Sequence, residues 1–388
     1  MAWRPIRPLF LNNQIYRNME LKVNRKAILD ALSGTGQVAA KTSTLPILEN
    51  VKVNVRADGT IVVTAFDLEV SAMRKFKFAD SAEPFDFCVN PRDLIGVLKT
   101  LRDEEVTLVI DDVNCAIRHA KGEVSLPILP AIDFPEVGKD DNSVKITVES
   151  DTLFEWLKNA VKFVAVDKLR PMICGIYMYI EDMEFGVAAS DGKFLFTDNI
   201  RANIPSPMNA SGVLGTKAVS PLLDMLNGSE DVVVYFGEKM LSFRTSNAML
   251  SCIKPVGTFP RFKALIQPRE GTIVVNIDKK ELIDSASRTI MTARMDTGLL
   301  RLSASGNTFR VSSEDLMSAK SSFETCPCEV VGGEITIGVK GSNLMDCLNS
   351  IESENIVMEF VDEKRAIYIL DGSSPNKRVL LMPLMLVG

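Results

Sequence analysis

The stretch LKVNRKAILDAL, residues 21–32, decides how the whole chain is interpreted, because similar stretches occur twice more. They are ITVESDTLFEWL at 146–157 and VNIDKKELIDSA at 275–286. Each begins with the alternating apolar residues of a strand and continues with the apolar spacing of a helix. The starts lie 146 − 21 = 125 and 275 − 146 = 129 residues apart, far beyond the roughly 20–50-residue periods of solenoids. The sequence therefore predicts three tandem copies of a whole domain.

A second helical segment follows in each third: PRDLIGVLKTL (91–101), TKAVSPLLDML (216–226) and GSNLMDCLNSI (341–351). Apolar residues at i, i+4 and i+7 predict one buried face on each helix, formed by Leu94/Leu98/Leu101, Val219/Leu223/Leu226 and Leu344/Leu348/Ile351. Alternating, strand-like runs with turn signals fill the space between the helices. Each third thus reads strand, helix, three strands, and then the same again.

The domain limits follow from the loops between the thirds. Phe134-Pro135 and Phe259-Pro260 lie 125 residues apart and precede polar linkers, and proline stops a strand. We expect a disordered extension at 1–18 and three domains, at 19–138, 143–268 and 272–388. The predicted class is α+β, with two helices per domain packed on antiparallel sheet. An open strand edge can pair with another molecule and cause aggregation. Domains joined edge to edge therefore favour a ring of two chains, because a closed ring leaves no edge open.

Composition excludes several classes of protein. Hydrophobic residues make up 46% of the 388 and charged residues 24%, which is ordinary for a cytosolic protein, and no run approaches the roughly 18 apolar residues of a membrane span. Seven cysteines without a CxxC pair indicate reduced thiols. His119 is the single histidine. We therefore expect no cofactor, no metal site at Cys326 and Cys328, and no histidine-based catalytic centre.

Charge is distributed unevenly along the chain, although the net charge of −6 argues against simple binding of nucleic acid. Acidic residues crowd the strand and loop segments, whereas cations fall outside the apolar register of the helices. Such a distribution predicts a basic helical surface that contacts phosphates without reading sequence, although lysines on helices are also commonly just solvated. The helix-associated cations are Lys26, Arg92, Lys99, Lys158, Lys162, Lys217, Lys280, Arg288 and Lys340.

Six motifs in this order, spread over the three repeats, resemble the bacterial DNA polymerase sliding clamp, the beta subunit of the replicative polymerase. They are TLPILENV (44–51), TAFDLEV (64–70), LPAIDFP (129–135), ASDGKFL (189–195), GTFPRF (257–262) and LMPLMLVG (381–388). The resemblance implies three similar domains and a head-to-tail dimeric ring around duplex DNA. It also implies a protein that is not an enzyme. Lys41 and Arg170 would be further residues that face DNA.

The resemblance also implies a pocket that binds partner peptides, between the second and third domains. Its residues would be Ile173, Gly175, Ser190, Gly192, Lys193, Leu195, Pro260, Leu265, Leu380, Met382, Pro383 and Leu384. Here the sequence departs from the family at Lys193-Phe194, where His-Arg is familiar, and at Ala264, where arginine is frequent. An exposed run LLMPLMLV would favour aggregation, so packing or partner binding must cover it. The alternative is a last strand that merely completes a sheet.

The implied partners are duplex DNA, the catalytic subunit of the replicative polymerase, the clamp loader, other proteins with clamp-binding peptides, and a second copy of the chain. For the dimer contact we expect Ile290 and Met291 on one side and the strand 106–110, with Leu108 and Ile110, on the other. The alternative is that Ile290 and Met291 are core residues. Two other functions remain open: a hydrolase that uses Asp191 and Asp198, and a scaffold that binds only proteins.

Overall fold

The computed structural model describes residues 19–138, 140, 143–167, 169–202, 204, 208–267 and 272–386. The extension expected at 1–18 lies outside the described residues. In chain order, the elements βαββββαβββ occur three times, which is the order that the repeated sequence predicts. The domain limits drawn from that repeat stay predictions.

The first run comprises β1 (Met19–Asn24), α1 (Arg25–Gly36), η1 (Pro46–Glu49), β2 (Val51–Val55), β3 (Thr60–Phe66), β4 (Val70–Lys77), β5 (Phe85–Val89), α2 (Pro91–Thr100), β6 (Glu105–Ile110), β7 (Asn114–His119), β8 (Gly122–Pro130) and η2 (Ala131–Asp133). The second comprises β9 (Val144–Glu149), α3 (Ser150–Ala160), η3 (Val161–Phe163), η4 (Pro171–Ile173), β10 (Gly175–Glu181), β11 (Glu184–Ser190), β12 (Phe194–Arg201), β13 (Ala210–Gly215), α4 (Thr216–Leu226), β14 (Asp231–Phe236), β15 (Met240–Arg244), β16 (Ala248–Ile253) and η5 (Lys263–Leu265).

The third run comprises β17 (Ile273–Asp278), α5 (Lys279–Ile290), β18 (Leu299–Ser305), β19 (Thr308–Asp315), β20 (Lys320–Val331), β21 (Ile335–Lys340), α6 (Gly341–Leu348), β22 (Asn355–Phe360), β23 (Ile367–Asp371) and β24 (Ser374–Leu381).

Local sequence explains where several helices begin. The side chains of Asn24, Asn90 and Asp278 each accept a hydrogen bond from a backbone N–H in the first turn of α1, α2 and α5, at 3.1, 3.0 and 2.8 Å. Such caps satisfy N–H groups that have no partner within the helix. On α2, Leu94 and Leu98 are fully buried, as their spacing predicts.

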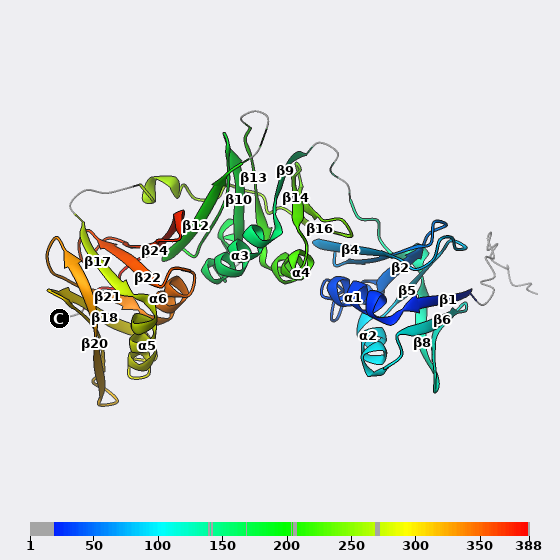
Figure 1. Ribbon diagram of the computed structural model, residues 1–388, viewed down its shortest axis with the longest axis horizontal. Coiled ribbons are helices and arrows are strands. Elements are labelled where there is room, and N and C mark those ends of the chain that lie inside the picture. Colours follow the sequence, from blue (N-terminus) through cyan, green and yellow to red (C-terminus); the bar gives the residue numbers. More distant parts are fainter. Residues whose placement is uncertain are drawn as a thin grey trace, which may run out of the picture. The chain divides into compact units, whose positions relative to one another are not determined.

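The chain divides into two compact units. Unit 1 is Met1–Lys139 with Arg244–Ser251. Its sheet runs β1-β6-β7-β8-β5-β2-β3-β4, and β16 follows β4. The Lys75 N–H donates to the Asn247 carbonyl at 2.9 Å. Helices α1 and α2 pack against each other, and α1 contacts β3 and β4 (Figure 1).

Unit 2 is Asp140–Phe243 with Cys252–Gly388. Its larger sheet has twelve strands, in the order β13-β10-β11-β12-β24-β23-β22-β17-β20-β19-β18-β21. Strand β12 pairs antiparallel with β24, with Phe194 opposite Leu381, so that the second and third runs share one sheet. Helix α3 packs with α4 and α5 with α6 (Figure 1). These antiparallel sheets with paired helices confirm the predicted α+β class.

One predicted strand edge is wrong. Strand β6 pairs with β1 on one side and with β7 on the other, so residues 106–110 offer no open edge. Leu108 and Ile110 are fully buried and cannot contact a second chain. The short segment 19–24, read mainly as the start of a repeat, forms the strand that covers this edge. Within the described residues, no helix has the length and apolarity that a membrane crossing requires.

Candidate functional site

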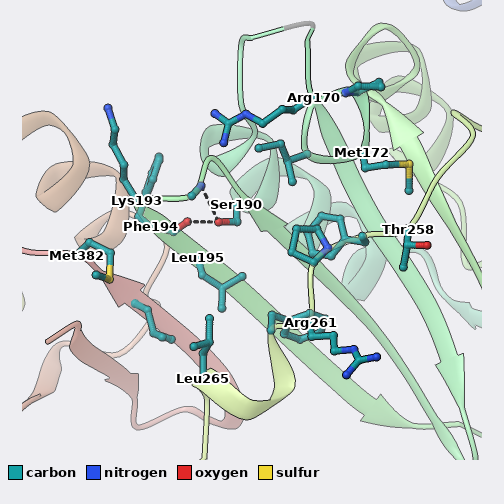
Figure 2. Close-up of a pocket in the computed structure, with 17 residues that line it drawn as sticks. Arg170, Met172, Ser190, Lys193, Phe194, Leu195, Thr258, Arg261, Leu265 and Met382 are labelled. Atoms are coloured by element: carbon teal, nitrogen blue, oxygen red, sulfur yellow. Dashed lines mark hydrogen bonds between the residues drawn. The ribbon is translucent and has the colours of Figure 1, made fainter.

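A cavity of about 410 Å³ opens in unit 2, where β12 and β24 meet (Figure 2). Four segments of chain build it: the loop with η4, the turn from β11 to β12, the stretch from Thr258 through η5, and the end of β24. The lining residues are Arg170, Pro171, Met172, Ile173, Ser190, Gly192, Lys193, Phe194, Leu195, Thr258, Phe259, Pro260, Arg261, Phe262, Leu265, Leu380 and Met382.

The floor of the cavity is apolar and firmly held. Leu195 and Leu380 are direct partners across the β12–β24 ladder, and both belong to one buried cluster with Ile173. Leu265 and Met382 stand at the mouth, 49% and 45% exposed. Buried residues thus fix the shape, while two half-exposed apolar side chains remain available to a ligand.

Aromatic side chains support one wall. The Phe259 ring stacks on Tyr177 with centroids 4.7 Å apart and planes 7° apart. Phe262 meets Phe259 edge to face at 6.1 Å. The Tyr368 hydroxyl, which comes from β23, donates to the Leu265 carbonyl at 2.6 Å. These contacts hold the segment after β16 against the third run, so the wall is preformed.

The turn from β11 to β12 is fixed by its own polar side chains. The Ser190 hydroxyl donates to the Phe194 carbonyl at 2.7 Å and accepts from the Gly192 N–H at 3.0 Å (Figure 2). Asp191 accepts from the N–H groups of Lys193 and Phe194 at 2.7 and 3.1 Å. Gly192 has φ +91°, a conformation that favours glycine. The turn presents its backbone rigidly, and the Lys193 carbonyl accepts from the Met382 N–H at 2.8 Å.

The cavity includes most of the residues expected for a peptide pocket. It brings together Ile173, Ser190, Gly192, Lys193, Leu195, Pro260, Leu265, Leu380 and Met382. Gly175, Pro383 and Leu384 are not among its lining residues. A Cβ on Gly175 would lie 2.4 Å from the Leu214 carbonyl oxygen, so this glycine allows close strand packing. The Leu384 N–H donates to the Gly338 carbonyl at 2.7 Å, which ties that part of the tail to β21.

Sequence reasoning missed several lining residues. Met172, Phe194, Thr258, Phe259, Arg261 and Phe262 line the cavity, and Arg170, expected to face DNA, lies at its mouth beside Gly192 (Figure 2). Phe194 lies in the motif ASDGKFL and four others lie in GTFPRF, whereas Arg170 and Met172 lie outside the six motifs and close to Ile173. The signal was therefore present, but adjacency in sequence does not show which side chains turn into a cavity.

The other cations expected to face DNA are solvent-accessible, and several have partners on the protein. Arg92 donates to the carbonyls of Ala40 and Lys41 at 2.6 and 3.2 Å. Arg288 makes two hydrogen bonds of 2.5 Å to Glu324, and Lys158 pairs with Glu155 at 3.0 Å. Such exposed pairs are weak and exchange readily. The exposed cations are Lys26, Lys41, Arg92, Lys99, Lys158, Lys217, Lys280, Arg288 and Lys340, and Lys162 is half-buried.

A buried network of charged groups lies next to the β12–β24 pair. The Lys377 side chain is only 3% exposed and bonds Glu352 at 2.8 Å and Asp371 at 3.1 Å. Burial opposes ionisation of Asp371. However, the N–H groups of Glu352 and Ser373, the Ser373 hydroxyl and Lys377 outweigh burial and hold its pKa well below the usual range. A charge-assisted network of this kind rigidifies the strands that carry it.

Asp198 and Asp191 do not form a catalytic carboxylate pair. Burial raises the pKa of Asp198 to about 6, with Lys377 and hydrogen bonds from the Asn199 N–H and the Trp156 indole acting in the opposite direction. Asp198 is 4% exposed, and Asp191 is occupied by backbone N–H groups. Neither carboxylate offers the open, paired arrangement that a hydrolase needs.

The cysteines do not suggest redox or metal chemistry. All seven are free thiols, and burial raises the pKa of Cys88, Cys115 and Cys252 to about 12. Thiols in this state are poor nucleophiles. Across the described ranges, no group of three histidine, cysteine or acidic residues could hold a metal ion.

Comparison with known proteins places these features in context. The family model for the N-terminal domain of the DNA polymerase III beta subunit matches residues 19–138, and the model for its C-terminal domain matches residues 264–385. The chain is 23% identical over 370 residues to the beta sliding clamps of Pseudomonas aeruginosa and Escherichia coli K12. Each alignment covers 95% of this chain and all of the relative.

Solved structures share the fold. The DNA polymerase III subunit beta from Pseudomonas aeruginosa bound to griselimycin superposes with a TM-score of 0.91 at 23% identity, covering 95% of this chain and all of that one. The DNA polymerase sliding clamp from Bacillus subtilis gives 0.89 at 20% identity, covering 96% and 100%.

Proposed function

Because the chain belongs to the family of the DNA polymerase III beta subunit, the beta sliding clamp, we propose that it closes a ring around duplex DNA and tethers the replicative polymerase. It is a non-catalytic accessory subunit. The single observation that carries the tethering role is the cavity beside β12 and β24, with its buried apolar floor and half-exposed Leu265 and Met382. Such a cavity suits the apolar anchor of a short peptide.

Retention on DNA would be topological. A ring needs only weak contacts with phosphates, because many tight contacts would prevent it from sliding. The exposed cations on the helices, of which Lys26, Lys99 and Lys280 are examples, supply contacts of this kind. A tether raises the local concentration of the polymerase to roughly the millimolar scale, so a peptide of about micromolar affinity is enough.

Partners would exchange at the cavity. We propose that the polymerase catalytic subunit, the clamp loader and other proteins with a similar peptide dock there in turn, and that the protein works in the cytoplasm, where the chromosome of a bacterium is copied. Weak binding by each partner allows replacement, because the lifetime of a complex shortens as affinity falls.

The strand 106–110, predicted to contact a second chain, is paired on both sides within its own chain. Other strand edges must therefore form the joint between two chains. Within the chain, the fourth strand of one run pairs with the last strand of the next: β4 with β16, and β12 with β24. Among the described strands, the fourth strand of the third run, β20, and the last strand of the first run, β8, have no such pairing with another run. Strand β20 pairs with β19 through 320–327 and with β17 only at 328–331. Strand β8 pairs with β7 through 122–127 and with β5 at 128–130. We propose that these two edges join head to tail between chains.

The residues expected earlier at the joint lie close to one of these edges. Thr292, which follows α5, hydrogen-bonds Ser322 on β20, so exposed Met291 is near that edge. Ile290 packs instead against Gly341, where a Cβ would come within 2.6 Å of it. Met291 therefore stays in the proposed contact, while Ile290 has a structural role within the chain.

Phe323→Asp is expected to give monomers. Phe323 is 61% exposed on the free part of β20, and a carboxylate there would have to lose its water in the joint. Light scattering should report the mass of one chain instead of two. Val256→Asp, at a side chain 96% exposed and in neither of the two strands, is the matched control and should stay dimeric. A Phe323→Asp protein that remains a dimer would place the joint elsewhere.

The ring itself is tested on DNA. The protein is loaded on circular plasmid by a clamp loader, and the plasmid is then cut at one site. We expect the protein to stay on the circle and to leave the linear product, because nothing but closure holds it. Retention on linear DNA would contradict topological holding, and failure to remain on the circle would favour the scaffold that binds only proteins.

A further inference from the structure

The mouth of the cavity is strongly cationic. Arg170, Lys193 and Arg261 all line it, whereas its other lining residues include no aspartate or glutamate. The three come from three separate segments and lie on different sides of the apolar floor (Figure 2). The guanidinium of Arg170 lies over the turn, with Nη1 3.7 Å from the position that a Cβ on Gly192 would take.

Of these three cations only Arg170 forms an ion pair within the part of the chain that the structure describes, with Asp167. Asp191 is engaged with the N–H groups of Lys193 and Phe194. Asp167 accepts from the Leu169 N–H at 3.0 Å and reaches Arg170 only at 3.8 Å. Glu181 is paired with Lys263, a neighbouring cation that is not among the lining residues. Among the described residues, Lys193 and Arg261 have no ion-pair partner, so positive charge remains exposed around the apolar floor.

We infer that the segment that occupies this cavity is an acidic peptide, with an apolar anchor on the floor and carboxylates on the flanks that face Arg170, Lys193 and Arg261. This inference rests on the proposed function and specifies the class of partner. Charge-assisted hydrogen bonds to arginine are directional, and complementary charge selects partners and speeds association more than it adds affinity. The chain's own residues 1–18 are a poorer occupant, because they contain Arg4, Arg7 and Arg17 and no acid.

The experiment is an unbiased selection. Random twelve-residue peptides are selected on the full-length protein at low salt, and only those that lose binding to the uncharged variant Leu265→Gln are counted as cavity ligands. The expected ligands carry more Asp and Glu than Lys and Arg relative to the input library. The combined changes Arg170→Glu, Lys193→Glu and Arg261→Glu reverse the charge of the rim. They should weaken binding of the selected peptides by about tenfold, since each exposed ion pair contributes modestly. A new selection on this variant should favour basic peptides.

A matched variant with the same change in charge separates local from general effects. Lys145→Glu, Arg301→Glu and Lys364→Glu alter exposed cations that do not line the cavity, and binding of the selected peptides should change less than twofold. Cavity ligands that are neutral or basic, or a labelled peptide of residues 1–18 that outcompetes the acidic ligands, would overturn the inference alone. If no peptide depends on Leu265, the docking role under the proposed function fails as well.

Discussion

Lys377→Met is expected to destabilise unit 2 by about 3–5 kcal/mol, the usual cost of removing one partner from a buried ion pair. The Lys377 side chain is 3% exposed and that of Asp371 is fully buried, so the change leaves a carboxylate in a dry site without its cation. Asp198 loses the same nearby charge. Thermal unfolding should shift down by roughly 6–12 °C for a unit of this size.

The loss of stability caused by Lys377→Met should depend on pH. The pKa of Asp371 is lowered in the folded protein, so its contribution is present above the unfolded value of 3.8 and is lost as pH falls. Without Lys377, Asp371 and Asp198 can relieve the uncompensated charge by binding protons, and the deficit should therefore be smaller at pH 5 than at pH 8. Lys364→Met removes an exposed lysine and should change stability by less than about 0.5 kcal/mol. Equal free energies of unfolding for Lys377→Met and Lys364→Met at pH 8 would show that the network does not stabilise the fold.

Leu265→Asp combined with Met382→Asp is expected to weaken polymerase binding by at least about a hundredfold. Each apolar side chain that a partner covers contributes roughly 1.5–3 kcal/mol, and each new carboxylate would have to lose water beside an apolar anchor. Both side chains are about half exposed, so the fold should survive. Primer extension on circular template should fall back to the short products of polymerase alone, because neither the polymerase nor the clamp loader can dock at the altered cavity.

Ile132→Asp provides the control, because Ile132 is 91% exposed in unit 1 and does not line the cavity. It should support long products at the level of the unchanged protein. If the double variant also supports them, with unaltered thermal unfolding as evidence that both proteins are folded, the cavity is not the tether.

Local patterns in the sequence were enough for the elements and their order. The repeated strand–helix starts, the apolar faces of the second helices and the alternating runs between them predicted βαββββαβββ in each run, because these periods act over a few neighbouring residues. The turn at Ser190–Lys193 is held by local hydrogen bonds between residues of the motif ASDGKFL. Here short-range chemistry decides the geometry.

Pairing between distant segments was outside the reach of such patterns. The strand 106–110 resembles an edge in sequence, yet β1, more than eighty residues earlier, covers it. Arg170 was assigned to DNA and lies at the cavity, and Lys377, one lysine among many, proved to be buried against Asp371.

The sequence by itself determined that one order of strands and helices is used three times, and its resemblance to the clamp family indicated which stretches form the cavity. Only the tertiary structure decided which side chains face that cavity, which cations ring it and which strand edges stay open. The physical reason is that these properties depend on β12 meeting β24 and on other ladders between residues far apart in the chain. Alternation in a strand specifies two faces but not the neighbours that cover them.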